Sequence, residues 1–435
     1  MAGKKTQAQL TPEEKLQQVL VPEAEQPYKV PANWCWTYLK NVSDCLDNFR
    51  KPINANERNA RLGDVPYYGA TGQVGWIDDY LTNEELVLLG EDGAPFLDLL
   101  KNKAYLINGK AWVNNHAHIL RSKFGTMGNR LLIEYLNSFD FTGFVTGTTR
   151  LKLTQASMNK IIIPLVPLAE QQRIVERIES LFAKLDEAKE NMQNVLEGFE
   201  TRKAAILHKA FTGELTANWR KQHGVSMDSW EEKALGKIVK NIKDKYEPTL
   251  NNKKCVKYIG LEHIEKNNGI IGFGSSDDVK SLKTIFELGD ILYGKLRPYL
   301  NKHDIAKFSG ICSTDILVYR AEDFNTAKFI NYFMNTEKFI FYTVSNSKGI
   351  NLPRISEKEV SGILVNVPTL SEQSEIVRII DDLLAKEQQA KELAENAITK
   401  IDIIKKSILA RAFRGELGTN NPADEPAVEL LKLVL

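Results

Sequence analysis

Cysteine, methionine and histidine are scarce in this chain, and long apolar runs are missing. Its 435 residues include six methionines, six histidines and four cysteines, which stand singly at Cys35, Cys45, Cys255 and Cys312. Without a Cys-x-x-Cys pair, this pattern predicts free thiols in a reducing compartment rather than a disulfide framework. No apolar segment approaches the roughly 20 residues that a membrane-spanning helix needs, and the N-terminus lacks the apolar core of a signal peptide. The sequence therefore predicts a cytoplasmic protein that has no membrane segment.

A strong net charge is also absent, because 57 basic residues oppose 56 acidic ones and leave a formal charge of +1. This balance argues against a small, highly basic nucleic-acid-binding protein. The charge is unevenly placed, however, and residues 218–369 are more basic than the rest of the chain. The length suffices for about three domains. The sequence thus predicts several cores, with residues 218–369 the best suited to face phosphate groups.

Motifs of a self-contained enzyme are missing as well. No G-x-x-x-x-G-K-[ST] phosphate loop occurs, since an apolar residue follows each of Gly109-Lys110, Gly236-Lys237 and Gly294-Lys295. The Asn/Asp-Pro-Pro-aromatic tetrapeptide of amino-methyltransferases is absent too. His116 and His118 form a His-x-His pair without a third ligand nearby, which favours a polar strand over a metal site. We therefore expect no catalytic residue, cofactor or metal in this chain.

What the sequence does contain is a second copy of one of its own segments. Residues 168–215 align without a gap on residues 370–417, with many identical positions. Both copies open on Glu-Gln, at Glu170 and Glu372, and both end on Ala-Phe-x-Gly-Glu-Leu. The period is too long for a solenoid, so it predicts one module written twice and an approximate internal two-fold. Duplex DNA is the commonest partner with matching symmetry.

Each copy carries the apolar spacing of a coiled-coil seam, in alternating steps of four and three residues. The first seam consists of Ile174, Ile178, Leu181, Leu185, Ala188, Met192, Val195 and Phe199. The second keeps this phase from Ile376 to Ile408 and includes Ile404, with Glu387 as its one polar member.

The seams predict two long helices that pair with each other. We expect the first helix to run from about residue 170 to residue 211, and the two helices to pack antiparallel as a central rod. Small residues of the second copy, among them Ala385 and Ala394, favour close approach. The alternative is a pair of unrelated core helices in two separate domains.

The segments before each repeat predict two divergent domains of mixed structure. Short apolar runs between Gly and Asn turns predict strands at 104–107, 112–120, 161–166, 257–259, 290–293 and 316–319, and a helix at 329–344. Trp34 of the first domain corresponds to Trp230 of the second. The predicted fold is α+β, with a lead-in at 1–30 whose helix starts at Thr11, domains at 31–167 and 218–369, repeated helices at 168–217 and 370–417, and a tail at 418–435.

Further motifs recur where each domain meets its helix. Pro-Leu-Val-Pro-Leu-Ala-Glu-Gln at 164–171 matches Val-Pro-Thr-Leu-Ser-Glu-Gln at 367–373, and the second domain carries Gly-Asp-Ile-Leu-Tyr-Gly-Lys-Leu-Arg-Pro-Tyr-Leu at 289–300. From residue 34 to 417 the chain resembles the specificity (S) subunit of type I restriction–modification systems. The resemblance implies two homologous α/β target recognition domains, joined by two antiparallel helices that form a central coiled coil with pseudo-two-fold symmetry.

The same resemblance implies a function without catalysis. Each recognition domain reads one half of a bipartite site in double-stranded DNA, and the helices set the spacer and dock two methyltransferase (M) subunits. Endonuclease/translocase (R) subunits complete the complex. S-adenosylmethionine, ATP and Mg belong to those partner subunits rather than to this chain.

Candidate DNA-contacting residues are polar and basic side chains on turns, because base reading needs paired donors and acceptors and phosphate binding needs Lys or Arg. In the first domain these are Arg50, Lys51, Tyr68, Thr71, Gln73, Asn114, His116, Gly147, Thr148, Thr149 and Arg150. In the second they are Lys243, Lys245, His263, Tyr293, Lys295, Arg297, Tyr299, Ser347, Lys348 and Asn351. The turns at Gly147 and Gly349 are equivalent, which suits a symmetric backbone contact. For Tyr293 and Tyr299 the alternative is a place in the core, and for Arg297 it is an internal ion pair.

Two other functions stay open from the sequence alone. One is a self-contained DNA methyltransferase or nuclease, against which the missing motifs argue. The other is a coiled-coil adaptor that binds only protein. Such an adaptor does not need two large divergent domains, and the basic second domain also speaks against it.

Overall fold

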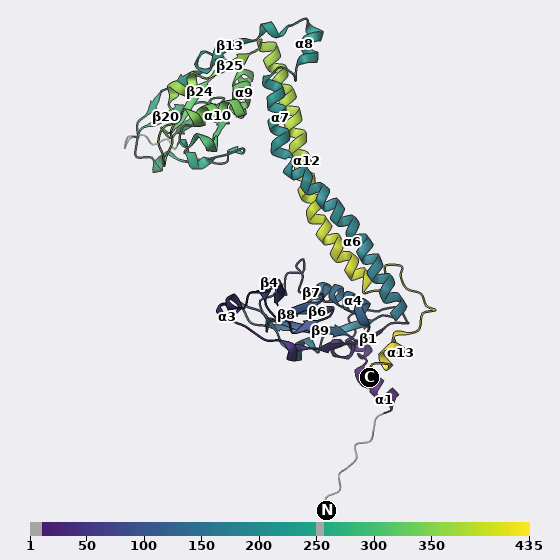
Figure 1. The fold of residues 1–435 in the computed structure, drawn as a ribbon. Helices are drawn as coiled ribbons and strands as arrows, with labels where there is room; N and C mark the ends of the chain where they lie inside the picture. The colour runs from purple at the N-terminus through teal and green to yellow at the C-terminus, as the bar shows by residue number, and fades with distance from the viewer. Residues whose placement is uncertain (1–10, 249–255) are drawn as a thin grey trace, which may run out of the picture. The chain divides into compact units, whose positions relative to one another are not determined.

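The structure, a computed structural model, describes residues 11–248 and 256–435. They form two compact units, unit 1 with residues up to 192 and residues 396–435, and unit 2 with residues 193–395. Cys255 and the first ten residues of the lead-in lie outside the described residues. Each unit holds one mixed α/β domain and one pair of helix segments (Figure 1). Among the described residues, no helix has both the length and the apolar character that crossing a membrane requires.

Two four-stranded sheets build the domain of unit 1. The first is antiparallel throughout, in the order β2 (Ser43–Cys45), β9 (Ala117–Ser122), β6 (Leu86–Gly90), β7 (Ala104–Ile107). The second is parallel only where β3 meets β8, in the order β4 (Gly72–Ile77), β3 (Val65–Gly69), β8 (Lys110–Val113), β5 (Thr82–Asn83). Helix α4 (Gly125–Ser138) packs on β6, β7 and β9 and covers the face of β6 that carries Val87 and Leu89. Leu86 and Leu88 on the other face pack against β8 of the second sheet, so β6 is apolar on both faces and buried along its length.

Short elements complete unit 1. Strand β1 (Cys35–Tyr38) pairs antiparallel with β12 (Ile162–Leu165), and β10 (Val145–Thr146) pairs with β11 (Lys152–Leu153). The short helices are α1 (Pro12–Val19), α2 (Leu39–Val42), α3 (Ala55–Ala60), α5 (Gln155–Met158) and α13 (Ala427–Lys432), with 3-10 turns at Glu23–Glu25 and Asp47–Phe49. The predicted start of α1 is confirmed, because the side chains of Thr11 and Glu14 form a reciprocal capping box.

The C-terminal segment belongs to the core of unit 1. Leu409, Phe413 and Leu431 are buried in the same apolar cluster as Trp34. The ring of Phe413 lies edge-on to that of Tyr135, with their centroids 5.0 Å apart. Residues from opposite ends of the sequence therefore complete one core.

Unit 2 repeats this plan with different lengths. Its antiparallel sheet has the order β14 (Lys240–Ile242), β24 (Ile316–Arg320), β21 (Ile291–Gly294), β22 (His303–Ile305). A five-stranded sheet, parallel only where β23 meets β16, has the order β15 (Lys245–Tyr246), β20 (Lys283–Phe286), β23 (Gly310–Cys312), β16 (Lys257–Ile259), β19 (Gly274–Ser275). Strand β13 (Glu231–Ala234) pairs with β25 (Leu364–Val367), as β1 does with β12, and β17 (Ile264–Glu265) pairs with β18 (Gly269–Ile270).

The helical segment expected at 329–344 is two helices. The helices of the unit 2 domain are α8 (Ala217–His223), α9 (Phe324–Phe333), α10 (Glu337–Ser345) and α11 (Glu357–Ser361), with 3-10 turns at Met227–Ser229, Leu235–Lys237, Leu261–His263, Ser276–Asp278 and Pro298–Leu300. A single helix does not form, because α9 ends at Phe333 and Thr336 caps the start of α10. The Thr336 hydroxyl donates to the Phe333 carbonyl at 2.7 Å and accepts from the amide of Phe339 at 3.4 Å. The apolar run at 112–120 is likewise two strands, β8 and β9, joined by a turn.

The long helices are α6 (Leu168–Glu197), α7 (Phe199–Phe211) and α12 (Leu370–Ala412). In unit 1, Asp186 of α6 binds Lys405 of α12 at 2.5 Å, and Lys189 of α6 binds Asp402 of α12 at 2.9 Å. The later residue of α6 thus pairs with the earlier residue of α12, so the two helices run antiparallel. In unit 2, Arg202 of α7 binds Glu387, the polar member of the seam, at 2.7 Å. Each unit therefore contains an antiparallel helix pair (Figure 1).

Two details of the seam differ from the prediction. The first helix is not continuous, because Gly198 interrupts it between α6 and α7, where glycine costs about 1 kcal/mol relative to alanine. In the second seam Ile404 is exposed. Lys405 takes its place, half-buried, with its ammonium group 4.9 Å from the ring centroid of Phe182. Of the small residues, Ala394 is buried and Ala385 is exposed.

Candidate nucleic-acid interface

A buried carboxylate joins the domain of unit 1 to its long helix. Glu170, at the start of α6, is fully buried. Its carboxylate accepts from the indole Nε1 of Trp34 at 2.7 Å, from the Thr419 hydroxyl at 3.1 Å and from the Asn420 amide at 2.8 Å. The position in the first helical turn also suits a negative charge.

Unit 2 makes the equivalent contact with an added cation. The fully buried carboxylate of Glu372 accepts from Trp230 Nε1 at 3.0 Å and from the Thr216 hydroxyl at 2.7 Å. Arg220, buried beside it, binds it at 2.5 Å. The Trp and the Glu that recur in both halves therefore serve to fix each domain on its helix. We term this contact the tryptophan–glutamate tie.

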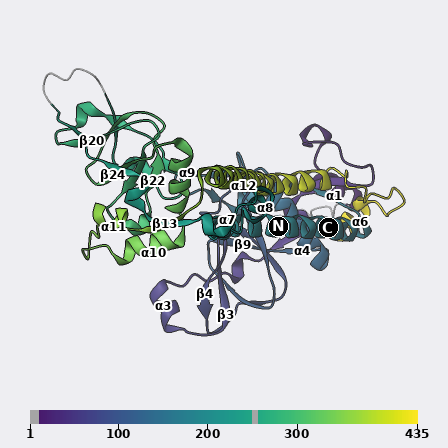
Figure 2. The same ribbon diagram turned by 90° about the horizontal axis from the view of Figure 1, so that it is seen from above.

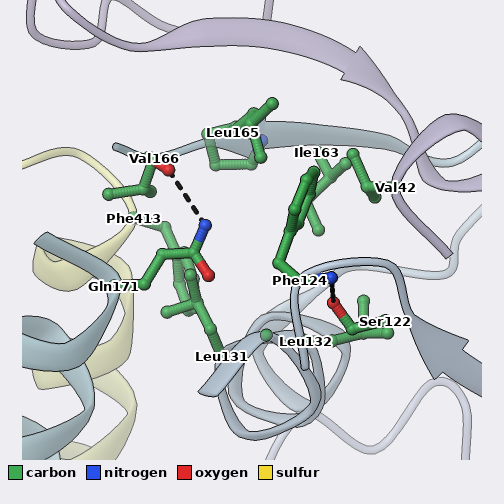
Figure 3. A pocket seen from close by; sticks show the side chains of 12 residues that line it. Val42, Ser122, Phe124, Leu131, Leu132, Ile163, Leu165, Val166, Gln171 and Phe413 are labelled. Carbon is green, nitrogen blue, oxygen red and sulfur yellow. Dashed lines mark hydrogen bonds between the residues drawn. The ribbon is translucent and has the colours of Figure 1, made fainter. Parts of the chain in front are cut away.

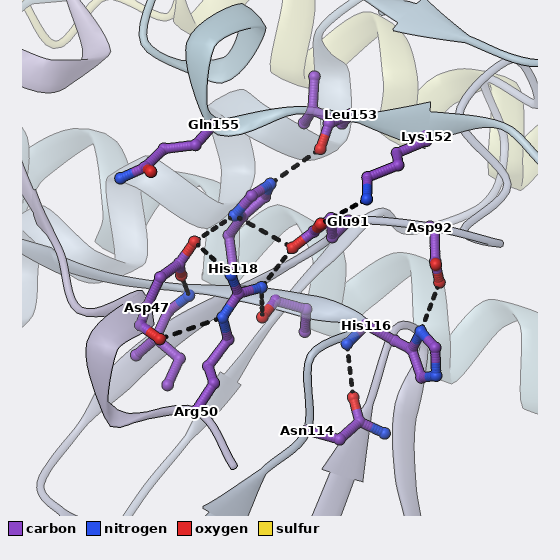
Figure 4. A network of polar contacts seen from close by, with 12 residues as sticks. Asp47, Arg50, Glu91, Asp92, Asn114, His116, His118, Lys152, Leu153 and Gln155 are labelled. Atoms are coloured by element: carbon purple, nitrogen blue, oxygen red, sulfur yellow. Dashed lines mark hydrogen bonds and ion pairs between the residues drawn. The ribbon is translucent and has the colours of Figure 1, made fainter. Parts of the chain in front are cut away.

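In unit 1 the structure brings His116 and Arg150 together at one acid, Asp92, with Asn114 beside them; Figure 4 shows Asp92, His116 and Asn114. The Asp92 carboxylate lies 2.7 Å from both His116 Nδ1 and Arg150 Nη2. The backbone amide of His116 donates to Asn114 Oδ1 at 2.8 Å. The end of β8 and the β10–β11 turn thus form one surface. Arg150 is paired with Asp92 but keeps 59% of its side chain exposed on this surface.

Arg50 belongs to an internal ion-pair network instead (Figure 4). Its guanidinium binds Asp47 at 3.0 Å and forms a closer pair with Glu91, and only 17% of its side chain is exposed. Burial alone would raise the pKa of the Asp47 carboxyl, but the hydrogen bond to His118 and the charges of His118 and Arg50 hold that pKa below its usual value. The structure gives Arg50 a structural role in unit 1.

The same network contains a trio of possible metal ligands. Cys45, Asp47 and His118 offer ligand atoms within 4.8 Å of one another. Both ring nitrogens of His118 are already bonded to protein oxygen atoms, and the Arg50 cation touches Asp47. A metal ion would have to displace these contacts, so the trio fits an ion-pair network better than a metal site. His116 faces Asp92 and does not join it.

A hollow of about 510 Å³ adjoins the end of β8 in unit 1. Asn114 and His116 line it together with Asn54, Arg58 and Val74. Helix α3 and the β3–β4 hairpin border this hollow, and the two elements lie side by side in both views (Figure 2). Four further predicted residues neighbour these elements in sequence and have exposed or half-exposed side chains, but none of them lines the hollow: Lys51, Tyr68, Thr71 and Gln73.

In unit 2 three predicted lysines surround a smaller hollow of about 200 Å³. Lys243, Lys245 and Lys295 line it, with Thr284 and Glu357. Lys245 donates to the Thr284 hydroxyl at 3.2 Å, and Lys243 lies 3.7 Å from Glu357. Three ammonium groups against one carboxylate make this hollow attractive to a phosphate group.

The equivalent glycine turns adopt the same unusual backbone conformation. Gly147 has φ +100° and Gly349 has φ +106°, and residues other than glycine rarely adopt this backbone conformation. The turn of unit 2 brings Ser347, Lys348 and Asn351 beside Arg297, whose amide donates to the Pro353 carbonyl at 2.7 Å.

Two predicted residues of unit 2 have internal roles. Tyr293 is fully buried, its ring lies 5.4 Å from that of Phe339, and burial raises its pKa to about 12. Tyr293 thus takes the core alternative and is closed to a ligand in this conformation. His263 Nδ1 accepts from the Gly260 amide at 3.0 Å. Tyr299, in contrast, is half-exposed.

The sequence interpretation missed three residues of these surfaces. Arg58 lines the hollow of unit 1 and lies over the ring of Tyr67, 4.9 Å from its centroid. Arg354 closes the turn that carries Lys348, and Ile350 stands at its tip with 98% of its surface exposed. Arg58 and Arg354 were identifiable as cations near turns, whereas no sequence signal distinguishes Ile350 from a core residue.

A small cavity under α4 plays no part in these surfaces (Figure 3). It measures about 30 Å³, which is enough for one water molecule. The buried side chain of Gln171 lines it, and within the described part of the chain its Oε1 has no hydrogen-bond partner. In unit 2 the corresponding Gln373 Oε1 accepts from the Thr326 hydroxyl at 3.4 Å. The cavity is a packing difference between the two units.

Comparison with known proteins gives consistent matches. Residues 32–197 and 227–398 match the family described as "Type I restriction modification DNA specificity domain". The chain is 30% identical to the EcoDI type I restriction enzyme specificity subunit of Escherichia coli, over 64% of this chain and 68% of that protein. It is 36% identical to the putative type I restriction enzyme specificity subunit S.HindORF215P of Haemophilus influenzae, over 35% of this chain and only 38% of that protein.

Solved structures share the fold. The HsdS subunit from Thermoanaerobacter tengcongensis superposes with a TM-score of 0.60 at 17% identity, covering 90% of this chain and all of that one. A chain from a study of complex assembly and conformational transition of the type I R-M system gives a TM-score of 0.64 at 17% identity, with the same coverage. At this identity the likeness establishes the fold alone.

Proposed function

This chain belongs to the type I restriction modification DNA specificity family, and from that premise we propose that it selects a bipartite DNA sequence for a type I restriction–modification complex. Each unit reads one half of the site through its α/β domain. The helix pairs set the distance between the two halves. The chain itself carries out no chemical step.

The observation that supports this proposal most directly is the duplication of the whole recognition unit. Both matched segments contain a domain, a glycine turn at positive φ and a tryptophan–glutamate tie to a long helix. The ties are built alike, while the surfaces around the turns differ in residue type. A constant frame with variable surfaces is suited to reading two unrelated half-sites.

Partners supply what the chain lacks. We propose that two methyltransferase subunits dock on the helix pairs and that endonuclease/translocase subunits join them. S-adenosylmethionine, ATP and Mg act in those subunits. The substrate is cellular or invading double-stranded DNA, so the complex works in the cytoplasm.

Domain exchange tests whether each domain recognises one half of the DNA site. Residues 31–167 are replaced by the corresponding domain of the EcoDI subunit, and the methylated sequence is determined in cells that supply the methyltransferase subunit. We expect one half of the site to change and the other half to stay. The matched exchange of residues 218–369 should change the opposite half. A change in both halves, or in neither, contradicts the proposal.

Native mass measurement of the purified complex tests the partner count. We expect two methyltransferase subunits for each copy of this chain. If the chain binds those subunits but the complex binds no DNA, the adaptor alternative replaces the present proposal.

A further inference from the structure

Ile350 stands at the tip of the glycine turn of unit 2 with an unusual degree of exposure. It is 98% exposed, and Leu352, two residues on, is 51% exposed. Single apolar residues at a surface are common and need no explanation by themselves. The loop that carries Ile350 differs from an ordinary surface in its rigidity and its charge.

Backbone hydrogen bonds hold this loop, residues 348–354, in one shape. The amides of Lys348 and Arg354 each donate to the carbonyl of the other at 2.8 Å, which closes the loop as a narrow pair. The segment at residues 295–297 supports the base of the loop. The Arg297 amide donates to the Pro353 carbonyl at 2.7 Å, and the Ile355 amide donates to the Lys295 carbonyl at 3.0 Å. Arg297 itself has φ +53°, a strained conformation that the surrounding bonds must maintain. The isoleucine is therefore presented on a fixed support.

Cations surround the apolar tip. Lys348 and Arg354 stand at its base, and Arg297 lies behind it on the supporting segment. Among residues 11–248 and 256–435, neither Lys348 nor Arg297 has an ion pair within 4.0 Å, while Arg354 pairs with Asp315 at 3.3 Å. A partner for this surface must offer negative charge on both sides of an apolar contact. Duplex DNA does so, with phosphates flanking stacked bases.

We propose that Ile350 acts as a wedge that enters the minor groove of the half-site bound by unit 2 and separates two neighbouring bases. Lys348 and Arg354 bind the phosphates on either side. Apolar side chains at the tips of rigid elements kink DNA in this way, and the unstacked step adds sequence selectivity because some base steps open more readily than others. This inference rests on the proposed function and assigns a specificity role to one residue within it.

Unit 1 has no such residue at the equivalent place. Counted from the matching glycines Gly147 and Gly349, Thr148 corresponds to Ile350, and its side chain is exposed but carries a hydroxyl. The wedge is therefore a property of unit 2, and the two half-sites are deformed differently.

Base-analogue fluorescence tests the wedge. The complex of this chain with its methyltransferase subunits is added to duplexes that carry 2-aminopurine or pyrrolocytosine at successive positions of the half-site. We expect fluorescence to rise several-fold at one base step with the natural chain and not with Ile350→Thr, which copies Thr148. Binding of Ile350→Thr should weaken about tenfold, within the range that unstacking contacts supply. Ile271→Thr, the same change at an exposed isoleucine of unit 2 outside this loop, is the matched control and should leave both readouts unchanged.

Three outcomes overturn the wedge, each in a different way. Specific binding without a fluorescence change at any step means that Ile350 separates no bases. If replacing thymine by uracil reproduces the loss seen with Ile350→Thr, the residue contacts a thymine methyl group in the major groove instead. If the natural complex shows no preference for a split site at all, the proposed function fails together with this inference.

Discussion

Glu170 and Glu372 make the same buried contact in two electrostatic settings. Glu372 faces the buried Arg220, while the hydrogen-bond partners of Glu170 are neutral. Glu372→Gln should lower the free energy of unfolding of unit 2 by about 3 kcal/mol, because it leaves a buried cation without its partner. Glu170→Gln is the matched change and should cost unit 1 only about 1 kcal/mol. Urea unfolding followed by tryptophan fluorescence measures both. Equal losses would mean that Arg220 contributes nothing to the tie.

Glu134 makes the stability of unit 1 depend on pH. Its pKa is raised to about 7, first by burial and then by the charge of Glu179, against the opposing effect of Lys405. The folded state thus binds this proton more tightly than the unfolded chain. Stability is greatest below the ordinary pKa of a glutamate and falls as pH rises through 7.

The corresponding variant is Glu134→Gln. Between pH 5 and pH 8 the natural chain should lose about 2 kcal/mol more unfolding free energy than this variant. Unfolding curves at the two pH values provide the measurement. An identical pH dependence in both proteins would show that the carboxyl group is ionised in the folded state throughout.

Lys348 offers a test of phosphate binding that is separate from the wedge. Lys348→Ala should weaken binding of the complex to every DNA sequence and reduce the slope of log affinity against log salt by about one unit. It should leave the fluorescence signal at the opened step in place. A changed sequence preference with an unchanged salt slope would contradict a phosphate contact.

Among the secondary-structure elements, helix α12 carries two alanines that differ in burial within the helix pair of unit 2. Ala394 is buried and Ala385 is exposed, although the sequence pattern gave both the same role. Ala394→Phe should destabilise the pair by about 2 kcal/mol through overpacking, and Ala385→Phe should change stability by less than about 0.5 kcal/mol. Thermal unfolding followed by the helical circular dichroism signal compares them. Equal effects would mean that the pair does not close at Ala394.

The periodic apolar pattern made the long helices predictable. The breaks in the helices were hard to predict, because single residues cause them. The four-three spacing indicates α6 and α12 because every seam residue repeats the same packing. Gly198 interrupts a helix through its backbone, and Thr336 begins a new helix through its side-chain hydroxyl, and an apolar pattern records neither effect. Lys405 replaced Ile404 in the seam because its ammonium group found Phe182 and Asp186, both on another helix.

The candidate site was predictable only where charge and turn chemistry marked it. Lys243, Lys245 and Lys295 do converge on one hollow. Arg50, chosen on the same grounds, is held by the nearby Asp47 and by Glu91, and the long-range pair with Glu91 cannot be read from spacing. Ile350 was not predicted, because an apolar side chain has neither the charge nor the hydrogen-bonding groups that mark a DNA contact in a sequence. The tryptophan–glutamate tie joins residues more than a hundred positions apart, and only the repetition of both residues signalled it.

At the scale of the whole molecule, the last residues of the chain stabilise a domain formed near its start. Thr419 and Asn420 bond to Glu170, and Ala427 and Leu431 are fully buried in the core of unit 1. Truncation after Phe413 should therefore expose the β1–β12 pair to hydrogen exchange and leave the β13–β25 pair of unit 2 protected. Leu433→Ser, at an exposed position of the same segment, is the control and should have no effect. Equal loss of protection in both units would contradict this division.

In the proposed function, one chain carries two reading units whose separation is fixed. Methylation mapping tests this arrangement on DNA from cells that express this chain with and without its methyltransferase subunit. We predict methylation at a split sequence with a constant spacer, and only when both proteins are present. A contiguous methylated sequence, or methylation by this chain alone, would contradict this arrangement and would mean that the chain contains an active site.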